Sequence, residues 1–166
     1  MSTASPALRE TADGVVRAAK ARGRSLATVE SCTAGALACL LADGEGASDV
    51  FHGGLVVYTK EAKSAVAGVP GFLIERHTAV SHEVALAMAR GGLERIPADV
   101  VVAITGVAGP DPDEDGNPVG LVHIAAVSRN GGERHVERRF GKKSKEEILQ
   151  SSMRDGLALL AELVTA

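Results

Sequence analysis

Ser31 lies in a short polar segment, Glu30-Ser31-Cys32-Thr33-Ala34-Gly35, between a strand-like run at 26–29 and an apolar helical run at 36–41. A serine held where a strand leads into a helix is exposed, and the free N–H groups of the helix N-terminus can bind an oxyanion or a phosphate. The segment therefore predicts a nucleophile site. The alternative is that Ser31 or Thr33 only caps the helix.

A serine nucleophile needs a base, and none of the five dispersed histidines stands at an obviously paired position. Lys63 follows a second strand-like run and falls on the first turn of a short helix, from where its amine can reach back toward Ser31. A lysine accepts a proton only when desolvation lowers its pKa toward neutrality. The alternative is that Lys60, Glu61 and Lys63 form a solvated helix face.

Three strand-like runs each end in a hydroxyl-bearing residue: Ser31, Tyr58 and Thr105. Ligands of open α/β sheets bind beyond the carboxyl ends of the strands, so parallel neighbours would bring these residues to one pocket. After Thr105, Gly106 and Gly109 permit close backbone approach to a phosphate or ribose. Glycine-rich turns after strands are common, so this loop alone is a weak signal.

The sequence predicts no metal site. The residues from Asp111 to Gly116 copy the opening of a calcium loop, but Val122 stands where that loop needs a bidentate glutamate. The histidines show no paired metal-binding spacing. Cys32 and Cys39 do not make a disulfide framework, and we expect both to be reduced and partly buried.

Composition argues against nucleic-acid and membrane binding. The formal net charge is −3 and aromatic residues make up only 2% of the chain. No basic excess exists to neutralise phosphates. No apolar stretch reaches the roughly 18 residues of a membrane span, and the segment from Met1 to Arg9 has no signal-peptide pattern. We therefore expect a cytoplasmic protein.

The element pattern predicts an α/β fold: a single three-layer α/β/α sandwich, with a mixed, mostly parallel sheet, over residues 1–166. Strand-like runs alternate with helical patterns up to residue 104, and Gly53–Thr59 and Val100–Ile104 indicate strands buried on both faces. Arg129-Asn130-Gly131 indicates a hairpin turn. Further helices are expected after Ser5-Pro6, over 34–42 and 60–67, after Ser81, and after the capping-box spacing of Ser144 and Glu147.

Several blocks in order resemble the C-terminal domain of the CinA family, whose characterised members are nicotinamide-nucleotide amidases. The resemblance covers nearly the whole chain and rests on five segments: 30–35, 54–63, 79–81, 104–110 and 118–120. It implies hydrolysis of the carboxamide of nicotinamide mononucleotide to nicotinic acid mononucleotide and ammonia, without metal or organic cofactor. Longer members carry an additional N-terminal domain, so the chain is similar to the stand-alone form.

The resemblance also implies roles for individual residues. The serine matching Ser31 is the nucleophile and the lysine matching Lys63 is its base. The positions matching Ser48, Tyr58 and Thr105 resemble pocket residues that orient the dyad or the substrate. We expect the backbone N–H groups from Thr33 to Gly35 to bind the oxyanion, and Gly106 to contact the substrate.

The chain departs from the family pattern at four positions. Glycine is usual where Ala34 stands and asparagine where Lys60 stands, and we expect repulsion from Lys60 to lower the pKa of Lys63 further. Lys145 and Leu149 stand where the family carries arginines, and lysine does not reproduce a bidentate anion contact.

Two alternatives to a mononucleotide amidase remain. One is a non-catalytic module that senses nucleotides or binds a partner, and the other is a Ser/Lys amidase acting on a different small amide. The apolar stripe on the last helix and a hairpin edge also make a homodimer reasonable.

Overall fold

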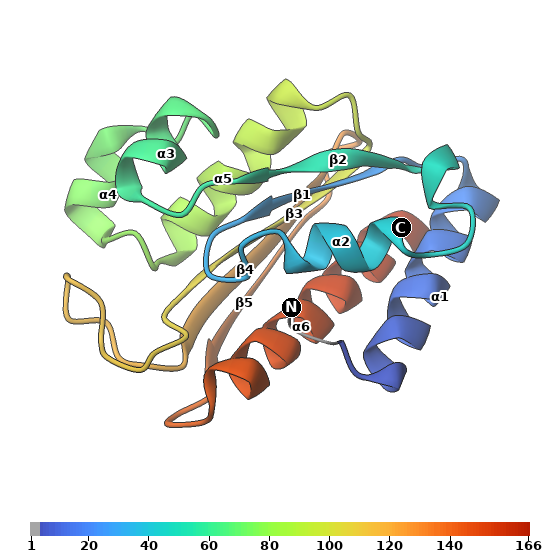
Figure 1. The fold of residues 1–166 in the computed structure, drawn as a ribbon. Helices are drawn as coiled ribbons and strands as arrows, with labels where there is room; N and C mark the ends of the chain where they lie inside the picture. Colours follow the sequence, from blue (N-terminus) through green and yellow to red (C-terminus); the bar gives the residue numbers. More distant parts are fainter. Residues whose placement is uncertain (1–3) are drawn as a thin grey trace.

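The computed structural model describes residues 4–166, so the first three residues of the Met1 to Arg9 segment lie outside it. One five-stranded sheet is covered by helices on both faces (Figure 1). The strands are β1 (Leu26–Glu30), β2 (Phe51–Val56), β3 (Val100–Gly106), β4 (Leu121–Ser128) and β5 (Glu133–Arg139). The helices are α1 (Pro6–Arg22), α2 (Ala36–Ala42), α3 (Lys60–Ala65), α4 (Gly71–His77), α5 (His82–Arg95) and α6 (Lys145–Thr165), with a 3₁₀ turn at Ala47–Asp49.

The sheet has the order β2-β1-β3-β4-β5. Strand β1 pairs in parallel with both β2 and β3, whereas β4 and β5 are antiparallel additions to the sheet. The predicted mixed sheet, including its closing hairpin, is therefore confirmed. Because β1, β2 and β3 are parallel neighbours, their carboxyl ends meet at one edge of the sheet.

Two apolar cores lie on opposite faces of the sheet. Helices α1, α2 and α6 pack on one face with alternate strand residues such as Val102 and Ile124. Helix α5 packs on the other face with the intervening residues, including Val101 and Ala103. The apolar stripe of α6 lies inside the first core, so it offers no surface to a second copy.

Helix starts follow the cap signals in the sequence. The Ser5 hydroxyl accepts the N–H of Leu8, and the Ser81 hydroxyl accepts the N–H of Val84. Ser144 and Glu147 form the reciprocal capping box at the start of α6. Each contact satisfies an N–H group that has no partner inside its helix.

The prediction of a doubly buried strand over Gly53–Thr59 is wrong. Strand β2 runs from Phe51 to Val56 at the edge of the sheet, with alternate residues exposed, and Thr59 caps α3 instead. An apolar run of this composition is compatible with a central strand and also with an edge strand that has alternate residues exposed. Because β2 ends at Val56, α3 starts close to the carboxyl ends of the strands, where Ser31 lies.

Helix α4, which the sequence reading missed, follows α3 on the same side of the sheet as α5 (Figure 1). Gly91 of α5 allows the chain after α3 to pack closely, since a Cβ at Gly91 would overlap the carbonyl oxygen of Ala67. The segment that carries Lys63 is therefore fastened to the main body of the fold at its end.

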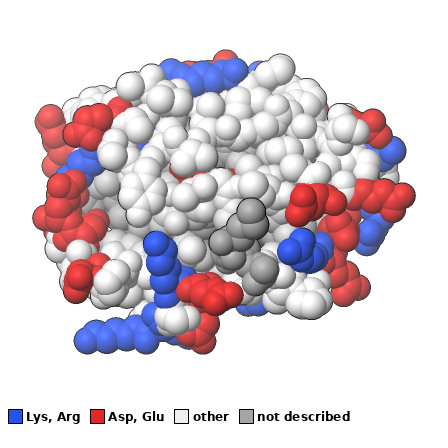
Figure 2. Space-filling model, in the orientation of Figure 1, with Lys and Arg blue, Asp and Glu red and all other residues white. Residues whose placement is uncertain are grey.

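Acidic and basic side chains alternate around the rim of the face shown in Figure 2, and uncharged atoms fill its centre. This face carries no continuous basic patch of the kind that binds nucleic acid. Among residues 4–166, no helix combines the length and apolar character needed to cross a membrane.

Candidate active site

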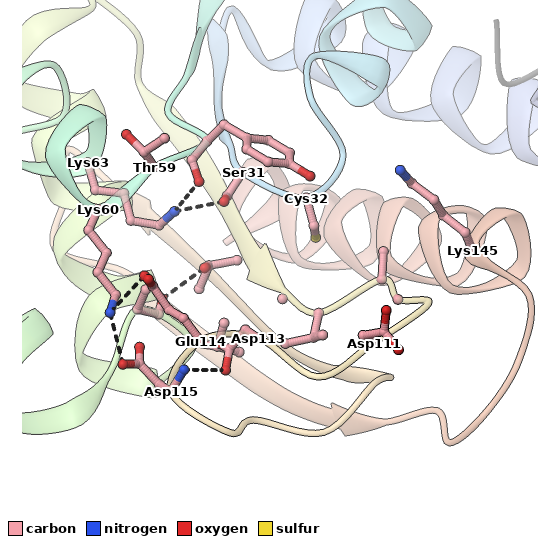
Figure 3. Close-up of a pocket in the computed structure, with 18 of the residues that line it drawn as sticks. Ser31, Cys32, Thr59, Lys60, Lys63, Asp111, Asp113, Glu114, Asp115 and Lys145 are labelled. Carbon is pink, nitrogen blue, oxygen red and sulfur yellow. Dashed lines mark hydrogen bonds and ion pairs between the residues drawn. The ribbon is translucent and has the colours of Figure 1, made fainter.

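A cavity of about 460 Å³ opens beyond the carboxyl ends of β1, β2 and β3. This volume falls in the range of pockets that hold small organic ligands, roughly 300–1,000 Å³. Residues after each of the three strands line it, together with the loop 107–115 and the first residue of α6. The parallel core of the sheet thus gathers polar groups from four distant parts of the chain (Figure 3).

Ser31 and Lys63 meet inside this cavity. The Lys63 Nζ atom lies 2.7 Å from the Ser31 Oγ atom, within hydrogen-bond distance (Figure 3). Ser31 directly follows β1, and its own N–H donates to the carbonyl of Ile104 on β3. The nucleophile candidate is therefore fixed by the sheet, and the lysine reaches it from α3.

Lys63 is a buried amine without an acidic partner. Its side chain is only 2% exposed, and none of the ion pairs between described residues includes it. Burial lowers the pKa of Lys63 from 10.5 to about 8. The interpretation of Lys63 as part of a solvated helix face is wrong, because the helix turns this residue inward.

Two backbone carbonyls set the orientation of the Lys63 amine. Nζ donates to the carbonyl of Val57 at 3.0 Å and toward that of Tyr58 at 3.4 Å. A neutral amine has two N–H groups and one lone pair. With both N–H groups directed at carbonyls, the lone pair of the neutral form faces Ser31 Oγ.

Glu30 is a structural residue of the site that the sequence reading missed. Its carboxyl group is fully buried and accepts the N–H groups of Gly35, Leu37 and Ala38 at 2.8–3.1 Å, as well as the hydroxyl of Thr28. The carboxylate therefore satisfies the otherwise unpaired N–H groups at the N-terminus of α2 and interacts favourably with the helix dipole. An acidic residue directly before a nucleophile candidate was the available signal.

The expected oxyanion site at Gly35 is wrong for the same reason. The N–H of Gly35 is bound by Glu30, and the N–H of Ala34 donates to the carbonyl of Ser31. Within residues 4–166, the N–H groups of Cys32 and Thr33 donate to no backbone carbonyl. These two amides follow Ser31 directly and are the remaining donors of the turn.

The predicted pocket residues divide into two groups. Tyr58, Thr105 and Gly106 line the cavity, and the buried Thr105 hydroxyl donates to the carbonyl of Ala79 at 2.9 Å. Thr33, Gly35 and Ser48 do not line the cavity.

Each of the three excluded residues has a structural reason. Thr33 is buried, and its hydroxyl has no partner among the described residues. Gly35 is the N-cap residue of α2, and its N–H is bound by the buried carboxyl group of Glu30. Ser48 precedes β2, at the opposite end of the parallel strands from the cavity, so the structure contradicts its placement in this pocket.

Lys60 is bound to the acidic loop on the far side of the cavity mouth. Its Nζ atom lies 2.9 Å from carboxylate oxygens of both Glu114 and Asp115 (Figure 3). The hydrogen bonds that Lys60 donates to Asp115 and then to Glu114 raise the pKa of Lys60, so these carboxylates stabilise its charged form. Burial, rather than the expected repulsion from Lys60, accounts for the lowered pKa of Lys63.

The start of α6 contributes a single cation. Lys145 lines the cavity, and none of the ion pairs between described residues involves it. Leu149, one turn later, is 8% exposed and belongs to the apolar core. The side chain of Leu149 therefore takes no part in lining the cavity.

Neither cysteine competes with Ser31 as a nucleophile. Cys32 is buried, and burial raises the pKa of its thiol to about 12, which disfavours the reactive thiolate. Cys39 is exposed, contrary to the expectation that it would be partly buried. Within residues 4–166, no group of three or more metal-binding side chains is arranged around a common point.

Comparison with known proteins places this fold in a defined group. The family model of the CinA C-terminal domain matches residues 8–164. A "CinA-like protein" from Synechococcus sp. (strain RCC307) is 42% identical over 88% of the chain, and one from Mycobacterium avium (strain 104) is 54% identical over 60% of it. The matched regions span only 35% and 23% of these two relatives.

Solved structures agree over nearly the whole chain. The competence/damage inducible protein CihA from Agrobacterium tumefaciens has a TM-score of 0.93 and 38% identity, covering 98% of this chain and 99% of its own. A CinA superfamily protein from Escherichia coli has a TM-score of 0.88 and 35% identity, with 94% and 90% covered. The chain belongs to the CinA C-terminal domain family.

Proposed function

We propose that this protein is a serine amidase that deamidates nicotinamide mononucleotide to nicotinic acid mononucleotide and ammonia. The observation that carries the proposal is the 2.7 Å contact between Ser31 Oγ and a buried Lys63 amine whose N–H groups are directed at two carbonyls. A pKa of about 8 leaves roughly a tenth of this amine neutral at pH 7. A nucleophile paired with an activated base is the minimum equipment for acyl transfer.

In the proposed reaction, Ser31 Oγ attacks the carboxamide carbon while its proton passes to Lys63 Nζ. The N–H group of Cys32, which follows Ser31 and lines the cavity, stabilises the resulting oxyanion. Lys63 then returns the proton to the amide nitrogen, the C–N bond breaks, and ammonia leaves. Water attacks the acyl-serine while Lys63 accepts its proton, and Lys63 then returns this proton to Ser31 Oγ as the acyl–Oγ bond breaks and the acid is released.

The charges of the cavity bear on how the substrate lies. Five carboxyl-bearing residues line it, against three lysines. A pyridinium ring is cationic and is attracted to an acidic wall. In this arrangement Lys145, on the opposite side from Lys60 and Lys63 (Figure 3), is the cation available to a phosphate.

The experiment is a measurement of ammonia and nicotinic acid mononucleotide released from nicotinamide mononucleotide by the purified protein. Ser31→Ala and Lys63→Met are each expected to abolish turnover while the fold, followed by circular dichroism, is kept. A nicotinoyl adduct on Ser31, trapped by acid quench and located by mass spectrometry, is expected in the wild type. Turnover that survives Ser31→Ala would refute the proposal.

A second candidate is favoured by the same excess of carboxyl groups over lysines. In this alternative, the protein is a Ser/Lys amidase whose substrate is a small amide without a phosphate. Such a substrate carries no dianion that the carboxylates of the cavity would repel. A panel of carboxamides with and without the ribose phosphate separates the two substrates. Tight nucleotide binding with no turnover of any amide would instead identify a non-catalytic binding module.

A further inference from the structure

Lys60 connects α3 to the loop that follows β3, across the mouth of the cavity. It is the first residue of α3, which carries Lys63 one turn later, and its ammonium contacts Glu114 and Asp115 of the loop that follows β3. The Lys60 side chain is 30% exposed and that of Asp115 is 25% exposed, so this contact is partly shielded from water. One ammonium thus binds two carboxylates across the cavity mouth.

The acidic loop is built so that these carboxylates face Lys60. Asp113 accepts the N–H groups of Asp115 and Asn117, which closes a tight turn. The Asn117 side chain donates to Thr78 at 3.1 Å, which anchors the far end of the loop. Lys60 therefore holds the loop on the side of Ser31 and Lys63, and Asn117 holds it on the far side.

Helix α3 depends on such external contacts. It is six residues long, and helices of this length are unstable in isolation. Its N-terminus is held by the Thr59 cap, which accepts the N–H of Ala62, and by the contacts of Lys60. Loss of the Lys60 contacts would loosen the start of α3, which would keep only the Thr59 cap, and would remove the only side-chain ion pairs between the loop and α3 that the described residues make.

We propose that Lys60 is a positioning residue: by binding Glu114 and Asp115 it latches the loop 107–117 to α3 and shields the Ser31–Lys63 pair from bulk water. The physical consequence concerns Lys63. Its amine is kept partly neutral by desolvation, so water entering through an open latch would favour the ammonium form. The inference deepens the proposed function, because an ammonium cannot accept the proton of Ser31.

The test is a pH titration of Lys63 itself, followed by NMR in protein made with ¹³C-labelled lysine and assigned with Lys63→Met. The wild type is expected to titrate near 8. Lys60→Met and the double variant Glu114→Gln/Asp115→Asn both open the latch and are expected to raise this midpoint by about one unit. At pH 7 that lowers the neutral fraction about tenfold.

Two further variants serve as controls. Lys60→Arg keeps a cation that can bind both carboxylates and is expected to retain the wild-type midpoint. Lys20→Met removes another lysine–carboxylate pair, to Asp49 at 2.7 Å, which lies outside the cavity, and is expected to leave Lys63 unchanged.

Lys60→Met removes a positive charge, whereas Glu114→Gln/Asp115→Asn removes two negative charges. The direction in which each variant shifts the Lys63 midpoint therefore distinguishes a positioning role from a direct charge effect. An upward shift in both supports the latch. Shifts in opposite directions would show a charge effect without positioning, and unchanged midpoints would show no coupling; either result overturns the inference. Because the titration needs no substrate, it stands even if nicotinamide mononucleotide is not hydrolysed, and that failure would count only against the proposed function.

Discussion

The two walls of the cavity are held by opposite kinds of polar contact. Behind Ser31, the fully buried carboxyl group of Glu30 accepts three backbone N–H groups of the turn and of α2. In front of Lys63, the ion pairs of Lys60 with Glu114 and Asp115 join two surface segments, and the Glu114 side chain is 74% exposed. The first wall is fully shielded from solvent, whereas the contacts of the second are only partly shielded.

This difference assigns distinct tasks to the walls. Buried hydrogen bonds are costly to break because the groups left behind find no water, so the wall behind Ser31 is rigid. Exposed ion pairs contribute little and are screened by salt, so the wall in front is adjustable. A fixed nucleophile facing a movable wall suits a site that must admit a substrate and then exclude water.

The largest effect is expected for Glu30→Ala. It leaves three N–H groups and the Thr28 hydroxyl without their buried acceptor, at about 1–3 kcal/mol each. We expect a loss of about 4 kcal/mol or more, measured by urea unfolding. Glu94→Ala, on the exposed surface of α5, is the matched control and should change stability by no more than about 0.5 kcal/mol. A loss below about 1 kcal/mol for Glu30→Ala would contradict the rigid wall.

Lys63→Met is expected to remove activity and to alter how stability depends on pH. The pKa of Lys63 is about 8 in the folded protein against 10.5 for the ordinary amine, so the unfolded chain binds more protons between these values. Stability conferred through this group therefore rises as pH increases from 8 to 10.5, by about 3 kcal/mol at most.

The measurement is the difference in unfolding free energy between Lys63→Met and the wild type at pH 7 and at pH 10.5. The variant should be the more stable at pH 7, and its advantage should shrink at high pH. Lys20→Met should act in the opposite sense and far more weakly, because the exposed pair with Asp49 raises the pKa of Lys20. A constant difference would show that Lys63 is not desolvated.

Ala34→Gly tests the backbone of the rigid wall. Ala34 has φ 50°, a left-handed conformation that costs a residue with a side chain about 1–2 kcal/mol. Glycine adopts it freely, so we expect a gain of about 1 kcal/mol in thermal or urea unfolding. Ala36→Gly, two residues later in the first turn of α2, should instead lose up to about 1 kcal/mol. Equal changes in the two variants would disprove strain at Ala34.

The smallest of the expected effects is a difference between the two walls in how amide hydrogen exchange responds to salt. Raising the salt concentration from about 0.1 M to about 1 M shortens the screening length from about 10 Å to about 3 Å. Amide hydrogen exchange in the loop 107–117 is expected to accelerate by up to about fivefold, as the pairs of Lys60 weaken. The amides of Leu37 and Ala38, bound to buried Glu30, should not respond. Equal responses would remove the contrast between the walls.

Much of the fold was predictable because its signals are local. The cap of Ser81, the capping box of Ser144 and the hairpin turn at Asn130-Gly131 each act over a few residues. The edge position of β2 was not predictable in this way, since it depends on which strands pair. The homodimer and the roles of Tyr58 and Thr105 stay predictions.

The site shows the same division. Ser31 at a strand end was visible in the sequence, and Lys63 was a candidate through chain order and family resemblance. Ser48 was assigned to the pocket by resemblance, yet it lies at the other end of the parallel strands. The role of Glu30 is not visible in the sequence, because a glutamate gives no sign of whether its carboxyl group is buried.

Local sequence patterns were enough to predict the helix starts at Ser5, Ser81 and Ser144, the β-α units that precede a hairpin, and the residue types available for acyl transfer. These properties depend on side-chain periodicity and short-range hydrogen bonds. Three features are visible only in the tertiary structure. The Lys63 amine is desolvated, the Glu30 carboxyl group accepts the Gly35 N–H that was expected to bind an oxyanion, and Lys60 forms an ion pair across the cavity. Burial and charge pairing join residues far apart in the chain, and they arise only when the sheet brings its strand ends together.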